Sequence, residues 1–102
     1  MEELLRCKTV QEAFRFLEKD DKRTLQETLE MCQIPAPSYQ EEKKAEYVLG
    51  KMQEAGLEDV HIDEVGNVLG VRKGNGNGPR IVLAGHTDTV FPMETDLTLK
   101  QD

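Results

Sequence analysis

The sequence predicts an α/β protein in which helices pack on a small mixed sheet. Helical signals fill the first part of the chain as far as Gly56. From Val60 onward apolar and polar residues alternate, as they do in half-buried strands. A short apolar run at Arg80–Gly85 has the composition of a buried central strand. The order of three helices followed by three strands therefore predicts one small α/β unit over residues 1–102.

Each of the three predicted helices opens with a hydroxyl residue and has a glutamate three positions later, the pattern of a capping box. The first helix is expected to begin at Thr9 and the second at Thr24, with Pro35 ending the second pattern. The third is expected to begin at Ser38 and to end at Gly56, which has the position of a helix-terminating glycine. Its apolar stripe consists of Ala45, Val48, Leu49, Met52 and Ala55.

Two strands and a turn are predicted after the third helix. Val60–Asp63 alternates like a strand, Gly66 and Asn67 allow a turn, and Asn67–Arg72 predicts a second, antiparallel strand. His61 falls on the polar side of the first strand, so we expect it to face solvent without a role in a site. Gly74–Pro79 predicts a flexible loop; a strand rather than a helix N-terminus follows it, which argues against a phosphate-binding loop.

Composition excludes several classes of function. The chain has 102 residues and a net charge of −7, which leaves no basic patch for nucleic acid. No apolar run is long enough for a membrane span, and the N-terminus is charged throughout, so a cytoplasmic protein is expected. Cys7 and Cys32 are widely separated and fall on predicted helices; we expect buried thiols in a reducing compartment. Charged runs at 18–23 and 40–46 are expected to be solvated helix faces.

His86 and Asp88 are the candidate site residues, because they follow the predicted central strand directly after Gly85. Residues two apart on an extended chain point to the same side, and Thr87 and Thr89 would then point to the other. A neutral imidazole binds zinc through one nitrogen while its other N–H commonly meets a carboxylate. The alternative is a histidine whose hydrogen bonds are satisfied at a strand end, beside an aspartate that caps a turn.

The stretch IVLAGHTDTVFP, Ile81–Pro92, closely resembles the first metal-binding motif of the M20 metallopeptidases. This family contains aminoacylases, di- and tripeptidases and glutamate carboxypeptidases. The resemblance extends to Ile34–Gly70, with its IPAPS turn, long helix and hairpin ending in D-x-x-G-N-V-x-G. It implies that residues 1–102 form the N-terminal fragment of a zinc-peptidase-like catalytic domain, without the lid or dimerisation domain.

By this resemblance, His86 corresponds to a metal ligand and Asp88 to the catalytic aspartate. The family typically holds two Zn²⁺ ions, or cobalt or manganese, and hydrolyses amide bonds of small peptides or N-acyl amino acids; such an enzyme can be a homodimer. The bridging aspartate, the glutamate base and the other ligands lie outside this sequence, so the chain alone is expected to be inactive. The alternative is a truncated, non-catalytic binding or interaction module derived from such an enzyme.

Overall fold

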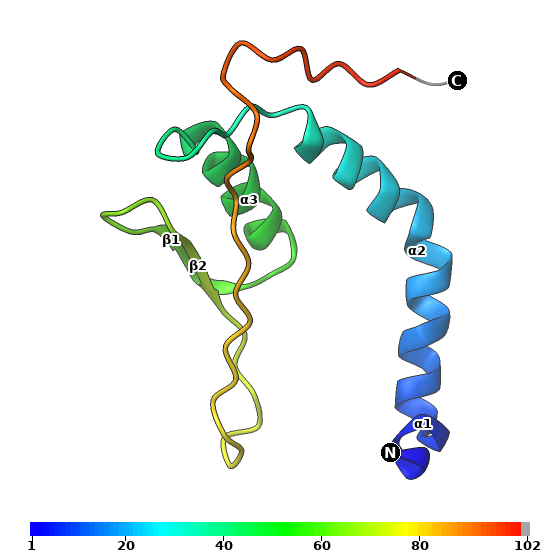
Figure 1. Cartoon of the computed structure of the whole chain (residues 1–102). Coiled ribbons are helices and arrows are strands. Elements are labelled where there is room, and N and C mark those ends of the chain that lie inside the picture. The colour runs from blue at the N-terminus through cyan, green and yellow to red at the C-terminus, as the bar shows by residue number, and fades with distance from the viewer. Residues whose placement is uncertain (101–102) are drawn as a thin grey trace. The chain divides into compact units, whose positions relative to one another are not determined.

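The computed structural model describes residues 1–100, which form three helices and two strands (Figure 1). The chain divides into two compact units, Met1–Cys32 and Gln33–Asp102. The predicted class, helices combined with a small sheet, is confirmed. The sheet itself contains two antiparallel strands rather than the three strands of a mixed sheet that the sequence predicts.

The first unit consists of a short helix, α1 (Glu2–Arg6), and a long helix, α2 (Lys8–Cys32). The prediction of separate helices beginning at Thr9 and Thr24 is wrong, because α2 runs through both positions. No glycine or proline lies between these threonines or before Cys32, so nothing in the sequence breaks the helix. The helix ends shortly before Pro35, as predicted.

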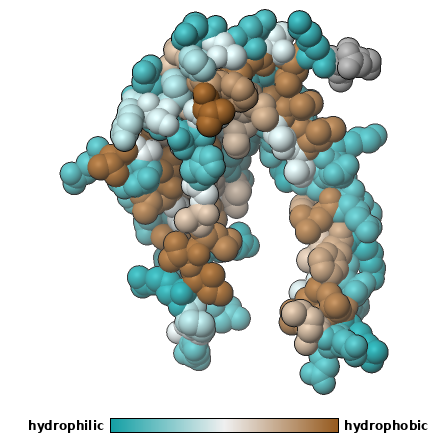
Figure 2. Space-filling model, viewed as in Figure 1, coloured by the Kyte–Doolittle hydropathy of each residue, from teal (hydrophilic) through white to brown (hydrophobic). Residues whose placement is uncertain are grey.

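Helix α2 is amphipathic, and Figure 2 shows apolar side chains gathered along one flank of it. Phe14, Leu17 and Leu25 are apolar residues of α2 and are exposed. The charged run at 18–23 is largely exposed, as expected of a solvated helix face. None of the helices within residues 1–100 is long and apolar enough to cross a membrane.

The two thiols correct a prediction, since Cys7 and Cys32 are both exposed rather than buried. Cys7 lies between α1 and α2 instead of within a helix. The backbone N–H groups of Val10 and, to a smaller extent, Thr9 hold the pKa of the Cys7 thiol below its usual value. Cys7 is thus the residue that immediately precedes α2, and Thr9 is already inside the helix.

The second unit begins with helix α3 (Glu42–Glu54), which starts later than the predicted cap at Ser38. Its C-terminus matches the prediction, because Gly56 follows the last turn with a φ of 73°. The N–H of Gly56 donates to the carbonyl of Gln53 at 2.9 Å, and that of Leu57 donates to Met52 at 3.1 Å. These two bonds form a Schellman motif, in which glycine avoids the cost of a left-handed conformation.

Strands β1 (Glu58–Ile62) and β2 (Val68–Val71) form the predicted antiparallel hairpin. His61 pairs with Leu69 and is exposed, as expected. The predicted turn is present, with Gly66 at a φ of 90°.

Helix α3 contacts both strands of the hairpin. Gly70 permits the approach, because a Cβ atom there would lie 3.1 Å from Leu57 Cδ1 and 3.3 Å from Met52 Sδ. Among the described residues the buried hydrophobic side chains are Ala36 and Ala45. The run at 40–46 is not solvated throughout, since Lys44 is buried next to Ala45 in α3.

The predicted central strand at 80–85 is absent, which corrects the fold expectation. Ile81, Val82 and Leu83 are 79%, 80% and 94% exposed. A strand needs a neighbour to satisfy its backbone groups, and within residues 1–100 no strand pairs with this segment. Beyond it, Thr89 forms an isolated parallel bridge with Pro37.

Candidate metal-ligand site

The candidate site lies within the second unit, where the segment around His86 meets the IPAPS turn. The turn closes through a hydrogen bond of 2.9 Å from the Gln40 N–H to the Pro37 carbonyl. Tyr39 has a φ of 69°, the sign that the third residue of a type II turn requires. The Tyr39 N–H donates to the Glu41 carboxylate at 2.9 Å, so the residue that follows the turn satisfies a backbone donor inside it.

Residues 36–38 of this turn are hydrogen-bonded to residues 88–89, about fifty residues further along the chain. We call this contact between the two segments the 36–38/88–89 junction. The Thr89 N–H donates to the Ala36 carbonyl at 2.7 Å, and the Thr89 hydroxyl reaches the same oxygen at 3.3 Å. The Ser38 hydroxyl donates to Asp88 Oδ2 at 2.7 Å. Ala36 is fully buried, so one part of the junction is shielded from water.

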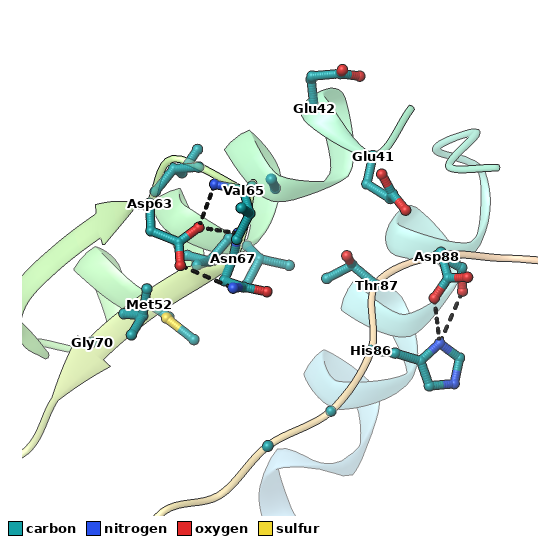
Figure 3. A pocket seen from close by; sticks show the side chains of 18 of the residues that line it. Glu41, Glu42, Met52, Asp63, Val65, Asn67, Gly70, His86, Thr87 and Asp88 are labelled. Atoms are coloured by element: carbon teal, nitrogen blue, oxygen red, sulfur yellow. Dashed lines mark hydrogen bonds and ion pairs between the residues drawn. The ribbon is translucent and has the colours of Figure 1, made fainter. Parts of the chain in front are cut away.

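His86 and Asp88 come together as their spacing predicts. His86 Nδ1 lies 3.0 Å from Asp88 Oδ1 and 3.1 Å from the Asp88 backbone carbonyl (Figure 3). Both oxygens are acceptors, so in the neutral imidazole Nδ1 carries the proton and Nε2 keeps its lone pair. The His86 side chain is 85% exposed. The arrangement therefore leaves Nε2 available to a ligand from solvent.

The carboxyl of Asp88 is held in its ionised form. The hydrogen bond from Ser38 is the largest cause that lowers its pKa below the usual value, and the hydrogen bond with His86 adds to it. An ionised carboxylate is the better acceptor for the imidazole N–H. It also favours the orientation in which the ring nitrogen without a proton faces away from the protein.

An open groove lies between this segment and the rest of the unit. It is lined by α3, the hairpin and residues 82–88. Figure 3 shows Thr87 projecting to the opposite side of the chain from His86, in agreement with the alternation expected of an extended segment. Thr89 makes the local hydrogen bonds that were expected of it.

The site supplies one candidate ligand rather than a full set. Within residues 1–100 no three His, Cys, Asp or Glu side chains are grouped so that they could hold a metal ion. A catalytic zinc site needs about three protein ligands. The donor chemistry of His86 fits such an ion, with Nδ1 occupied and Nε2 free, and its role as a ligand stays a prediction.

Ser38 is the residue that sequence reasoning missed at this site. Its pattern indicated a helix cap, but α3 begins at Glu42 and Ser38 bonds to Asp88 instead. The available signal was its place in the IPAPS segment, which resembles the same family as the motif around His86.

Comparison with known proteins finds relatives, two of which are named as a hydrolase and a dipeptidase. The chain is 46% identical over 61 residues to a protein of Pyrococcus abyssi named LysW-lysine/LysW-ornithine hydrolase, a match covering 60% of this chain and 17% of the relative. It is 45% identical over 70 residues to the cytosol non-specific dipeptidase of Escherichia coli K12, covering 65% of this chain and 14% of that enzyme. A third relative is the YgeY protein of Escherichia coli K12, at 39% identity over 62 residues, covering 60% of this chain and 15% of YgeY. No family model matches the chain.

These relatives are M20 family peptidases, so the resemblance stated from the sequence is confirmed. The match spans only about a sixth of the length of these relatives, at 17% of one and 14% of another.

Proposed function

We propose that this chain forms the N-terminal portion of the catalytic domain of a metal-dependent hydrolase of the M20 kind. The enzyme would cleave amide bonds of small peptides or N-acyl amino acids. The observation that carries the proposal is the pairing of His86 Nδ1 with the Asp88 carboxylate at 3.0 Å, which leaves Nε2 free. The relatives support the class of substrate, since one is named as a dipeptidase and another as a hydrolase of LysW-linked amino acids.

In this proposal His86 binds the metal through Nε2, with Zn²⁺ as the expected ion and cobalt or manganese as substitutes. A bound ion of this type polarises a substrate carbonyl and lowers the pKa of a bound water. Asp88 holds the imidazole in the Nδ1–H form and keeps its orientation fixed. The residues of this chain thus prepare one ligand of the site.

The remaining ligands, the glutamate base and any dimer contact would come from outside the described residues. Zinc chemistry needs about three protein ligands, and within residues 1–100 no group of that size is present. We therefore propose that the 102-residue chain hydrolyses no amide bond by itself. The name of the cytosolic dipeptidase among the relatives supports a cytoplasmic location.

The test is to express the complete reading frame that encodes these residues and to assay it with Zn²⁺, Co²⁺ or Mn²⁺. Dipeptides and N-acyl amino acids serve as substrates. We expect hydrolysis that a chelator abolishes. His86→Ala should remove it, and Asp88→Asn should lower it by about 10- to 100-fold, as loss of a partner that orients a metal ligand does.

His61→Ala is the matched control, because His61 is an exposed histidine on β1 that lies outside the groove lining. It should keep full activity. Hydrolysis that survives both the chelator and His86→Ala would refute the proposed function. Metal-dependent hydrolysis by the 102-residue chain alone would refute only its inactivity.

A second candidate is a non-catalytic interaction module, favoured by the exposed apolar segment at residues 81–83. In that case the complete reading frame would show no metal-dependent hydrolysis. The chain would instead bind another polypeptide through this segment, and His86→Ala would leave the binding unchanged. The hydrolysis assay and the His86→Ala variant thus separate the two functions.

A further inference from the structure

We propose that Ser38 is a positioning residue of this site, whose hydroxyl holds the Asp88 carboxylate in the orientation that fixes the His86 tautomer. The inference deepens the proposed function, on which its catalytic meaning rests. The quantity that it predicts is the tautomer of the His86 imidazole, which can be measured without metal or substrate.

The two oxygens of the Asp88 carboxylate have different partners. Oδ2 accepts the Ser38 hydroxyl at 2.7 Å, and Oδ1 faces His86 Nδ1 at 3.0 Å. The Asp88 side chain is 39% exposed, and the Ser38 hydroxyl is the partner that engages Oδ2. The Ser38 bond therefore supplies the restraint that keeps Oδ1 directed at the imidazole.

The Ser38 hydroxyl is itself fixed by its surroundings. Proline at position 37 sets the backbone entering the turn, and the bond from Gln40 N–H to the Pro37 carbonyl closes it. On the other side, the bond from the Thr89 N–H to the Ala36 carbonyl holds residues 88–89 against the turn. Both segments are thus anchored independently of the Ser38 side chain, which makes its hydroxyl a pre-positioned donor.

A simpler role must be distinguished from positioning. The bond between Ser38 and Asp88 could act only as one more tie across the 36–38/88–89 junction. The Thr89 hydroxyl offers a matched control, because it bonds to the Ala36 carbonyl at 3.3 Å in the same junction without touching the carboxylate. Thr89→Val removes that tie and keeps the shape of the side chain.

The experiment measures the tautomer of His86 by long-range proton–nitrogen correlation NMR on the metal-free 102-residue chain labelled with ¹⁵N. The measurement is made on the neutral imidazole. We expect the wild-type ring to be mainly in the Nδ1–H form. Ser38→Ala should shift the population toward the Nε2–H form, which neutral histidine favours when it has no partner.

Two further variants and one control measurement complete the test. Ser38→Thr keeps a hydroxyl and should restore the wild-type tautomer, and Thr89→Val should leave the tautomer unchanged. Slow hydrogen exchange of the backbone amide at position 89 shows in each variant that the junction is still formed. The proposal is overturned if Ser38→Ala keeps the wild-type tautomer, or if Thr89→Val shifts it equally. With the junction intact, a failure of Ser38→Thr to restore the tautomer has the same meaning.

The result is independent of the hydrolysis assay. An enzyme that is active but shows an unchanged His86 tautomer in Ser38→Ala would overturn the role of Ser38 and leave the proposed function standing. A protein without hydrolytic activity whose His86 tautomer responds to Ser38→Ala would overturn the proposed function and leave the role of Ser38 standing.

Discussion

Asp63 and Asp88 both have lowered carboxyl pKa values, but their donors come from different distances along the chain. Asp63 lies in the hairpin turn and accepts from the Val65 N–H at 3.0 Å and from the Asn67 N–H at 2.8 Å. The Asn67 side-chain amide donates at 2.9 Å and is the largest cause of the lowered pKa. Asp88 depends on Ser38, fifty residues away. The same local chemistry therefore stabilises a turn in one case and orients a histidine in the other.

The hydrogen bonds at Asp63 predict a pH dependence of stability. Its pKa is lower in the folded chain than the unfolded value of about 3.9. The carboxylate therefore contributes stability above that pH, and the contribution is lost as pH falls through the folded pKa. We expect Asp63→Asn to be less stable than wild type at neutral pH and the difference to shrink in acid.

Urea unfolding at a series of pH values measures this difference. Tyrosine fluorescence is a suitable signal, because the two tyrosines, Tyr39 and Tyr47, both lie in the second unit and the chain has no tryptophan. Glu64→Gln is the control, since it removes an exposed carboxylate from the same turn. A constant difference between wild type and Asp63→Asn across the acid range would contradict the prediction.

At the residue scale the sequence predicted the contact between His86 and Asp88 but not the part of Ser38. A spacing of two residues on an extended chain determines which side chains share a face. The position of Ser38 depends on a parallel bridge between Pro37 and Thr89. Local pattern contains no information on such a long-range pairing, so Ser38 was assigned to the nearest helix instead.

At the scale of elements, helix α3 contains Gly50 and is followed by Gly56, and substitutions at these two glycines should have opposite effects. Gly50 lies inside the helix, and a Cβ atom there would meet nothing within 4 Å. Gly56 has a φ of 73° after the helix end. We expect Gly50→Ala to stabilise the second unit by about 0.5–1 kcal/mol and Gly56→Ala to destabilise it by about 1–2 kcal/mol.

The urea midpoint followed by tyrosine fluorescence provides the comparison, and each variant is the control for the other because both add one methyl group. Equal shifts in the same direction would show that the backbone conformation at Gly56 does not determine the cost. The outcome bears on the site, because α3 follows directly from the turn that contains Ser38.

The elements predicted correctly are those whose determinants are local. Gly56 ends α3, and Gly66 with Asn67 forms the turn of the hairpin, because glycine tolerates the required positive φ at both glycine positions. The separation of α2 into two helices was wrong, since a Thr-x-x-Glu pattern at Thr24 cannot start a helix that already runs through it. The apolar run at 80–85 has strand composition, but composition supplies no hydrogen-bonding neighbour.

At the scale of the whole molecule, the chain buries little apolar surface for its length. Ala36 and Ala45 are the buried hydrophobic residues among those described, whereas many large apolar side chains are exposed. The relatives extend well beyond the matched region. The match to the Pyrococcus abyssi protein, for example, covers 17% of that protein's length. The exposed segment at 81–83 combines apolar side chains with backbone groups that no strand within residues 1–100 pairs with. Such a segment favours association between chains.

We expect the purified chain to associate as its concentration rises, with a mass above the 11.6 kDa of one chain in sedimentation equilibrium. Leu83→Lys places a charge on a residue that is 94% exposed and should shift the equilibrium toward the monomer. Val65→Lys is the matched control, because Val65 is 82% exposed in the hairpin turn and the change in charge is the same. If both variants reduce association equally, net charge rather than the 81–83 segment controls it. A wild-type chain that stays monomeric at all concentrations would refute the prediction altogether.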